Sequence, residues 1–238
     1  MRVLTVIPAR YGSSRFPGKP LAPILGKPMI RWVVEGAMKS NSTVVVATDD
    51  DRICKAVNDL VECHLTPSDL PSGTDRVHFV AKRYPHEIVV NLQGDEPLID
   101  GKLLDTLTLK LDEEVDIVTP VKRVNETQVN DPGSVFVVTD VNGFALYFSR
   151  SLIPHYRDKI EKVYLKHIGI YVFWKKSLER FVSLPQGRLE KIEKLEQLRA
   201  LENGMKIKVV EVNFDSHSVD YPDDIKKVEE ILKSRSSL

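Results

Sequence analysis

The sequence contains only two cysteines, Cys54 and Cys63, among its 238 residues. Two cysteines are too few for a disulfide framework, and no second pair of cysteine or histidine residues completes a zinc site. We therefore expect both cysteines to be ordinary residues of the core or of a helix face.

Long apolar runs are also absent, and none approaches the roughly 20 residues that a helix needs to span a bilayer. The chain passes from Met1 and Arg2 directly into a strand pattern, so no targeting segment is expected. These features predict a cytoplasmic protein that does not enter a membrane.

An excess of charge of one sign is missing as well, because 34 Lys and Arg residues balance 34 Asp and Glu residues. A chain without net charge has no long-range field that would draw it to nucleic acid or to an anionic membrane surface. Any polyphosphate ligand must therefore be bound by a local group of cations. The hydrophobic share of 42% is sufficient for a single large α/β domain.

The first half of the chain alternates between short apolar, β-branched runs and segments of helical periodicity. Strands are expected at 3–7, 43–47, 61–65 and 87–92, and helices from Pro28, at 51–60 and at 73–83. This alternation predicts a Rossmann-like α/β fold in which a mostly parallel sheet is flanked by helices. In such folds ligands bind at the carboxyl ends of the strands.

After Asp116 the pattern changes to strand-like segments with little helix between them. These segments are 115–121, 134–139 and 144–148, with a hairpin turn at 141–143. We expect one domain over residues 1–238, in which about 116–175 form a smaller antiparallel insertion. Its exposed strands are the expected surface of a homodimer. Further helices are expected at 177–182, 189–203 and 221–234, and a strand at 206–212.

The segment 10–21 (RYGSSRFPGKPL) follows the first expected strand and is rich in glycine and in cations. Gly12 and Gly18 allow the backbone to approach a ligand, while positive charge comes from Arg10, Arg15 and Lys19. Backbone N–H groups and cations at the end of a strand are what a triphosphate requires. The segment is not a Walker loop, because a proline follows Lys19. The alternative is a solvated basic turn.

Three further segments contain polar residues close to expected strand or helix ends. Asp95 in 93–98 (QGDEPL) directly follows a buried strand, where a hard carboxylate oxygen suits Mg²⁺ beside phosphate oxygens. A simple turn is the alternative there. The segments 72–76 (SGTDR) and 218–224 (SVDYPDD) are by themselves typical of helix N-termini, with Ser72 as one expected cap.

Polar side chains in the second half are candidates for a small-molecule pocket. Arg150 ends a hairpin strand, and its planar guanidinium is suited to bind a carboxylate. His167 and Tyr171 have an even spacing on one expected strand, so both should face the same side. A histidine satisfied within the core is the alternative for His167.

The segment 189–199 (LEKIEKLEQLR) has apolar residues at helical spacing with charges over the rest of its surface. Most of these charges are expected to be solvated. Glu193 and Gln197 are expected to form an ordinary pair on the helix surface, because they are four residues apart.

Together these segments resemble the sugar-nucleotide cytidylyltransferases, and most closely the branch that activates 3-deoxy-manno-octulosonate (KDO). In segment 10–21 the sialic-acid-activating relatives usually have a different residue in place of Tyr11 and asparagine in place of Pro20. Tyr221 stands where threonine is common in the KDO branch. The similar motifs keep their order and span residues 7 to about 224.

The resemblance implies that CMP is transferred from CTP to the anomeric hydroxyl of KDO, with release of pyrophosphate and with Mg²⁺ as cofactor, for lipopolysaccharide biosynthesis. It implies that Lys19, Asp95, Asp220 and Arg10 are catalytic and that Asp95 and Asp220 bind the metal. The implied nucleotide contacts are Ala9, Arg10, Gly12, Ser13, Arg15, Lys19, Ser72, Gly73, Arg76 and Asp95. The implied contacts with the sugar are Gln93, Arg150, His167, Tyr171, Glu190, Glu196 and Gln197.

Other functions remain open at this point. The nearest is a cytidylyltransferase for another sugar acid, such as sialic acid. A non-catalytic nucleotide-binding regulatory domain would keep a phosphate loop but has no need of two separated metal carboxylates. A retaining glycosyltransferase would have to use Asp49, Asp50 and Asp51 as its metal motif, and a helix cap explains these residues better.

Overall fold

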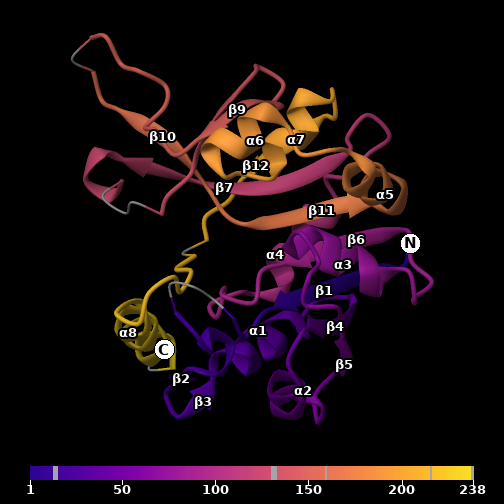
Figure 1. Cartoon of the computed structure of the whole chain (residues 1–238). Helices are drawn as coiled ribbons and strands as arrows, with labels where there is room; N and C mark the ends of the chain where they lie inside the picture. Colours follow the sequence, from indigo (N-terminus) through magenta and orange to yellow (C-terminus); the bar gives the residue numbers. More distant parts are fainter. Residues whose placement is uncertain (13–15, 130–132, 159, 215, 237–238) are drawn as a thin grey trace. The chain divides into compact units, whose positions relative to one another are not determined.

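The computed structural model describes residues 1–12, 16–129, 133–158, 160–214 and 216–236, and it divides into two compact units (Figure 1). The first unit contains Met1–Thr106 and Asp215–Leu238, and the second contains Leu107–Phe214. The antiparallel portion expected at about 116–175 falls within the second unit, which is longer because the helices and strand that follow residue 175 belong to it. Ser13 and Arg15 lie outside the described residues.

A parallel sheet forms the centre of the first unit, with its strands in the order β5 (Glu62–Leu65), β4 (Thr43–Thr48), β1 (Val3–Ala9) and β6 (Ile88–Leu92). The apolar runs of β1, β4 and β6 are buried almost throughout, which is typical of a parallel sheet with covered faces. The expected strands of the first half are therefore confirmed.

Helices flank this sheet, as the alternating pattern predicts. They are α1 (Met29–Ala37), α2 (Asp51–Val57), α3 (Gly73–Ala81), α4 (Gly101–Thr108) and α8 (Asp224–Ser236). The expected caps of two of them are confirmed, because Asp50 accepts a hydrogen bond from the Arg52 N–H and Ser72 accepts one from the Asp75 N–H. A 3₁₀ turn, η1 (Lys19–Leu21), and a short ribbon of β2 (Pro23–Ile24) and β3 (Lys27–Pro28) connect β1 to α1.

The two cysteines correct the sequence-based expectation, because Cys54 on α2 and Cys63 on β5 form a disulfide. Their Cα atoms are 5.3 Å apart although they are nine positions apart in the sequence. The chain reverses between α2 and β5, and this reversal places the two side chains against each other.

The second unit is built around β7 (Ile117–Asn125), which has partners on both edges. β10 (Val163–His167) and β11 (Ile170–Trp174) pair with β7 antiparallel, and β12 (Ile207–Glu211) pairs with it parallel. β8 (Phe136–Thr139) and β9 (Ala145–Ser149) form the expected hairpin, in which Gly143 has a φ of +77°. A short 3₁₀ turn, η2 (Glu126–Gln128), follows β7.

The single strand expected to carry both His167 and Tyr171 is wrong in detail, because two strands occupy this region. β10 ends at His167 and β11 begins at Ile170. Between them the Ile170 N–H donates to the Ile168 carbonyl at 2.7 Å, which closes a tight turn.

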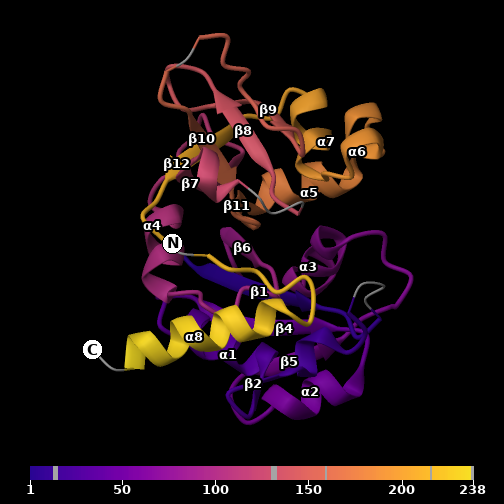
Figure 2. The same ribbon diagram turned by 90° about the vertical axis from the view of Figure 1, so that its left-hand side faces the viewer.

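The single helix expected at 189–203 is also wrong, because it is divided into α6 (Arg188–Glu193) and α7 (Gln197–Glu202), which Figure 2 shows as separate helices. Lys194 between them has a φ of +56°. The Arg150 guanidinium donates to the Glu193 carbonyl at 2.9 Å and to the Lys194 carbonyl at 3.4 Å, so α6 ends against this side chain. Glu193 therefore faces the end of β9, and the expected helical pair with Gln197 is absent.

α5 (Lys175–Ser183) packs against β11 and completes the second unit. Its Phe181 lies against Phe173 of β11, with a centroid separation of 5.9 Å. Within the described part of the chain, no helix has the length and apolar character that crossing a bilayer requires.

Candidate active site

A cavity of about 400 Å³ lies in the first unit, where β1 and β6 end and α3 begins. This is the carboxyl edge of the parallel sheet, the position at which α/β folds bind ligands. Nine of the side chains and glycines implied by the resemblance line it, and they are Ala9, Arg10, Gly12, Lys19, Ser72, Gly73, Arg76, Gln93 and Asp95. The structure thus brings together three sequence segments that are far apart in the chain.

The loop after β1 is closed by contacts to Tyr11. The Gly18 N–H donates to the Tyr11 carbonyl at 2.9 Å, and Gly18 has a φ of +73°. A Cβ at Gly18 would lie 3.2 Å from the Tyr11 hydroxyl, so both the backbone angle and the close packing favour glycine. Arg52 covers the Tyr11 ring at 3.5 Å from its centroid.

Asp49 is a member of this region that the sequence did not reveal, since its only expected role was in a helix cap. Its Oδ1 accepts a hydrogen bond from the Tyr11 N–H at 3.3 Å, and its Oδ2 lies 3.6 Å from Nη2 of Arg76. One carboxylate therefore contacts both the loop after β1 and the first turn of α3. The signal that could have found it is its position directly after β4, beside β1 in the sheet.

Arg76 is fully buried at the edge of the cavity. Its Nη1 donates to the Thr66 hydroxyl, while Nε and Nη2 have no hydrogen-bond acceptor among the described residues. Burial lowers the pKa of Arg76, Asp49 opposes that shift, and the charge of Arg10 adds to it. Buried donors normally have acceptors, so these two nitrogen atoms are suited to an anionic or carbonyl oxygen of a ligand.

Lys19 stands between the two carboxylates that the resemblance assigns to a metal. Its Nζ lies 2.5 Å from Oδ2 of Asp95 and 3.7 Å from Oδ1 of Asp220, and it also donates to the Val219 carbonyl at 2.8 Å. The side chains of the two aspartates are 27% and 26% exposed, so they remain accessible to small ions. Residues from three distant segments thus meet at one point.

The backbone around Asp220 explains how it reaches Asp95. The Val219 N–H donates to the Asp95 carbonyl at 3.0 Å. The Asp224 carboxylate accepts from the N–H groups of Asp220 and Tyr221 at 2.9 and 2.8 Å, which closes the turn before α8. The buried Glu96 accepts from the Ser216 hydroxyl at 2.6 Å and holds the start of the same segment.

The donor set at this point fits Mg²⁺. Mg²⁺ prefers hard oxygen ligands and is usually bound by one or two carboxylates together with substrate phosphates and water. The ammonium of Lys19 beside both carboxylates indicates that a positive charge is favourable there.

Gln93 is oriented by a short chain of side-chain amides. Its Nε2 donates to Asn91 Oδ1 at 3.0 Å, and Asn91 Nδ2 donates to the Thr74 hydroxyl at 3.0 Å. The Gln93 Oε1 atom lies beside Gly73, since a Cβ at that glycine would be 3.7 Å from it. The amide therefore faces Gly73 at the start of α3, which also lines the cavity.

His167 and Tyr171 of the second unit lie together, with ring centroids 5.4 Å apart, although they come from different strands. The Thr119 hydroxyl donates to the Ile170 carbonyl at 2.8 Å, so it accepts from Nε2–H of His167 at 2.9 Å. These two consecutive hydrogen bonds fix one neutral tautomer of His167 and leave its Nδ1 as an acceptor. Burial raises the pKa of Tyr171, and the charge of Glu196 adds to this shift.

The burial of His167 predicts a specific pH dependence of folding stability. Burial lowers the pKa of this imidazole from 6.5 to about 3, so between these values only the unfolded chain binds the proton. The stabilisation that comes from keeping His167 neutral is therefore present above about pH 6.5 and decreases as the pH falls below that value. From pH 6.5 to pH 5 the His167 contribution to this loss is about 2 kcal/mol.

Urea denaturation at the two pH values measures the effect. We expect His167→Gln to lose less stability than the wild-type chain, by about this amount. The matched control is His155→Gln, because His155 is exposed, and it should follow the wild type. Equal pH dependence in the wild type and the His167 variant would contradict the buried, neutral state of this ring.

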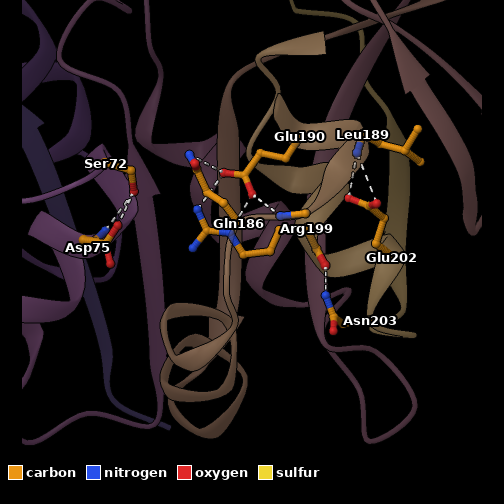
Figure 3. Close-up of polar contacts among 9 residues, drawn as sticks. Ser72, Asp75, Gln186, Leu189, Glu190, Arg199, Glu202 and Asn203 are labelled. Carbon is orange, nitrogen blue, oxygen red and sulfur yellow. Dashed lines mark hydrogen bonds and ion pairs between the residues drawn. The ribbon is translucent and has the colours of Figure 1, made fainter. Parts of the chain in front are cut away.

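Arg150 and Glu190 are already engaged by protein groups. The Arg150 guanidinium binds the carbonyl groups at the end of α6, and the Arg150 backbone N–H donates to the Glu193 carboxylate at 3.0 Å. Figure 3 shows the Glu190 carboxylate facing Arg199, with Nη2 and Nε of the arginine at 2.6 and 2.9 Å from its two oxygens. Both partners of this pair are buried. A sugar contact through Glu190 remains a prediction.

Gln197 differs from Glu190 because it has a hydrogen-bond donor that no protein group among the described residues accepts. It is buried, and its Nε2 has no acceptor among the described residues. Glu196, the residue before it, lies close enough to affect the pKa of Tyr171. Tyr171, Glu196 and Gln197 therefore carry polar groups suited to the hydroxyl groups of a sugar.

Comparisons with known proteins agree with this geometry. The family model described as Cytidylyltransferase matches residues 4–207. The chain is 47% identical over 242 residues to the 8-amino-3,8-dideoxy-manno-octulosonate cytidylyltransferase of Shewanella baltica (strain OS185), with 98% of this chain and 99% of that protein covered. It is 47% identical over 245 residues to the 3-deoxy-manno-octulosonate cytidylyltransferase of Desulfatibacillum aliphaticivorans, with 99% and 100% covered.

A solved structure is similar over nearly the whole chain. It is that of CMP:2-keto-3-deoxy-manno-octonic acid synthetase in complex with CTP, at 39% identity. The TM-score is 0.92, and the match covers 99% of this chain and 100% of that one. The chain is thus similar in structure, over nearly its whole length, to a protein that was solved with a bound nucleotide.

Proposed function

This chain belongs to the cytidylyltransferase family, and we propose that it transfers CMP from CTP to the anomeric hydroxyl of KDO, with release of pyrophosphate, for lipopolysaccharide biosynthesis. The observation that carries the proposal is the meeting of Lys19, Asp95 and Asp220 beside the cavity at the end of β1. The similarity to a synthetase solved with CTP supports the same assignment.

In this proposal the cations of the first unit bind the triphosphate. Arg10 and Lys19 contact its phosphate oxygens and offset the negative charge that builds on the leaving pyrophosphate. Arg76 donates its unsatisfied N–H groups to the nucleotide. The reaction forms a bond between the sugar oxygen and the α-phosphorus. It breaks the bond from the α-phosphorus to the oxygen that bridges it to the β-phosphorus, and the proton of the sugar hydroxyl is released to solvent. It requires alignment and charge neutralisation and needs no covalent intermediate with the protein.

Asp95 and Asp220 would hold Mg²⁺ against the α-phosphate. When bound, this ion supplies Lewis-acid polarisation of the phosphate and acidification of the sugar hydroxyl. Asp224 and Glu96 act as positioning residues, because their hydrogen bonds fix the segment that carries Asp220.

The second unit would supply contacts to the sugar acid. His167 offers Nδ1 as an acceptor, while Tyr171, Glu196 and Gln197 offer donors and acceptors to hydroxyl groups. Arg150 and Glu190 would complete the expected set within this unit. We further propose that the chain acts in the cytoplasm and as a homodimer, in which exposed Leu146 on β9 would contribute to the shared surface.

A second candidate substrate is 8-amino-3,8-dideoxy-manno-octulosonate. It is favoured by relatives named for that sugar, whose 47% identity equals that of a relative named for KDO. The two sugars share the carboxylate and the anomeric hydroxyl, so the proposed chemistry is the same for both.

A pyrophosphate-release assay with CTP, Mg²⁺ and a panel of sugar acids tests the proposal. We expect turnover with KDO or with its 8-amino analogue and a kcat/KM for sialic acid lower by at least about 100-fold, because polar groups built for one sugar are left unpaired by another. Omission of Mg²⁺ should abolish turnover. Pyrophosphate release that no octulosonate increases would contradict the assignment, and preference for the 8-amino sugar would select the second candidate.

A further inference from the structure

The ammonium group of Lys19 takes the position of a cation among acidic groups instead of extending into the open cavity. It has three N–H donors, and it faces two carboxylates and one carbonyl. The side chain is only 13% exposed, although it lines the cavity. The lysine that is proposed to bind the triphosphate is thus committed to Asp95, Asp220 and Val219 in this structure.

This position overlaps with that of the proposed metal ion. Mg²⁺ requires oxygen ligands at about 2.0–2.1 Å. Because Nζ lies 2.5 Å from Oδ2 of Asp95, an ion bound between the two aspartates would lie within a few ångströms of a second positive charge. Close like charges repel strongly where water is partly excluded. The two cations therefore compete for the same carboxylates.

Lys19 can leave this position without breaking the fold. A lysine side chain is a flexible four-carbon stem with a compact charge, and it can redirect its ammonium by rotation. The loop before it is held independently, through the Gly18 N–H bond to Tyr11 and the Tyr11 N–H bond to Asp49. A triphosphate in the adjacent cavity would offer new acceptors to the released ammonium.

We infer that Lys19 is an internal counter-cation of the metal site, which holds Asp95 and Asp220 together before nucleotide binds and is displaced to the triphosphate when Mg²⁺ enters. This inference rests on the proposed function, because it takes the two aspartates as the metal ligands. Displacement of Lys19 would make metal binding and nucleotide binding mutually dependent. The metal ion releases the ammonium for the triphosphate, and the triphosphate draws the ammonium away from the two aspartates. A second consequence is that the aspartates remain close together in the absence of metal, because the ammonium offsets their repulsion.

Mn²⁺ binding to the full chain without nucleotide tests the inference, with electron paramagnetic resonance of the free ion as the readout. Lys19→Met removes the charge and keeps most of the stem, so we expect it to bind Mn²⁺ at least about tenfold more tightly than the wild type. Lys19→Arg retains a cation and should bind as weakly as the wild type. The gain in Lys19→Met should disappear when Asp220→Asn is added.

Equal Mn²⁺ affinity in the wild-type chain and in folded Lys19→Met would overturn the inference. Lys19→Gln provides a second neutral variant if the methionine variant fails to fold, and the same result is decisive for it. The readout does not depend on turnover. Absence of activity with every sugar acid would therefore count against the proposed function alone, and normal activity with equal Mn²⁺ affinities would count against the inference alone.

Discussion

Replacing Asp95 or Asp220 by asparagine is expected to lower kcat by at least about 100-fold while the chain stays folded. Each substitution removes one charged oxygen ligand from the proposed metal position, and a bound metal ion contributes several kcal/mol to stabilising a phosphoryl-transfer transition state. The fold should persist because the hydrogen bonds of the Asp95 carbonyl and the Asp220 N–H remain in both variants, and the asparagine amide keeps an oxygen that faces Lys19.

The measurement is steady-state pyrophosphate release at saturating CTP, together with thermal denaturation of each variant. Asp223→Asn is the matched control, because Asp223 is exposed and lies three residues after Asp220. It should retain the activity of the wild type. Near-normal activity in either the Asp95 or the Asp220 variant would remove that residue from the metal site.

Replacing Arg199 by methionine is expected to destabilise the chain by about 3–5 kcal/mol, because it leaves the buried Glu190 carboxylate without its counter-ion. The side chains of this pair are only 5% and 6% exposed, and the two hydrogen bonds between them are bidentate. A buried pair loses much more when one partner is removed than an exposed pair does. Denaturant unfolding monitored by circular dichroism measures the loss.

Two further variants identify the cause of that loss. Glu190→Gln combined with Arg199→Met should recover at least half of the stability, because the glutamine carries no charge and can still accept from the Gly187 N–H. Arg180→Met is the matched control, since Arg180 is 48% exposed and its contact with Asp116 is 3.9 Å long. It should change stability by less than about 1 kcal/mol. A loss of similar size in Arg180→Met, or no recovery in the double variant, would refute the explanation.

Much of the first unit could be predicted from the sequence, because its signals are local. The apolar runs of β1 and β4 and the caps Asp50 and Ser72 are properties of short segments. The segment after β1 could also be predicted to line a ligand cavity, because its glycines and cations occur together. Eight of the ten implied nucleotide contacts line the cavity, and the other two, Ser13 and Arg15, lie outside the described residues.

The sequence-based predictions were wrong where contacts between residues far apart in the chain decide the structure. The periodicity of 189–203 favours one helix, but Arg150 binds the carbonyls at Glu193 and Lys194 and ends it early. The cysteine pair was missed because only the reversal between α2 and β5 places the two sulfur atoms together. Such contacts leave no pattern within a short segment of sequence.

The roles of Asp49 and Glu96 were missed for the same reason. The local sequence indicates only a helix cap for Asp49, although this residue contacts Tyr11 and Arg76. Glu96 directly follows Asp95 in the sequence, and no local pattern indicates that it is buried and bonded to Ser216, 120 residues away. For Asp220, local sequence suggests only a helix N-terminus, and the metal role was inferred from resemblance.

In the proposed complex, one cation site joins Asp95 and Asp220 beside a triphosphate bound by Lys19. A crystal structure of the chain with Mn²⁺ and a non-hydrolysable CTP analogue tests it most directly, because anomalous scattering locates the metal. We expect an anomalous peak within about 2.5 Å of an oxygen of each aspartate, with Lys19 Nζ moved onto a phosphate oxygen. A peak elsewhere, or a triphosphate bound away from Lys19, would contradict it.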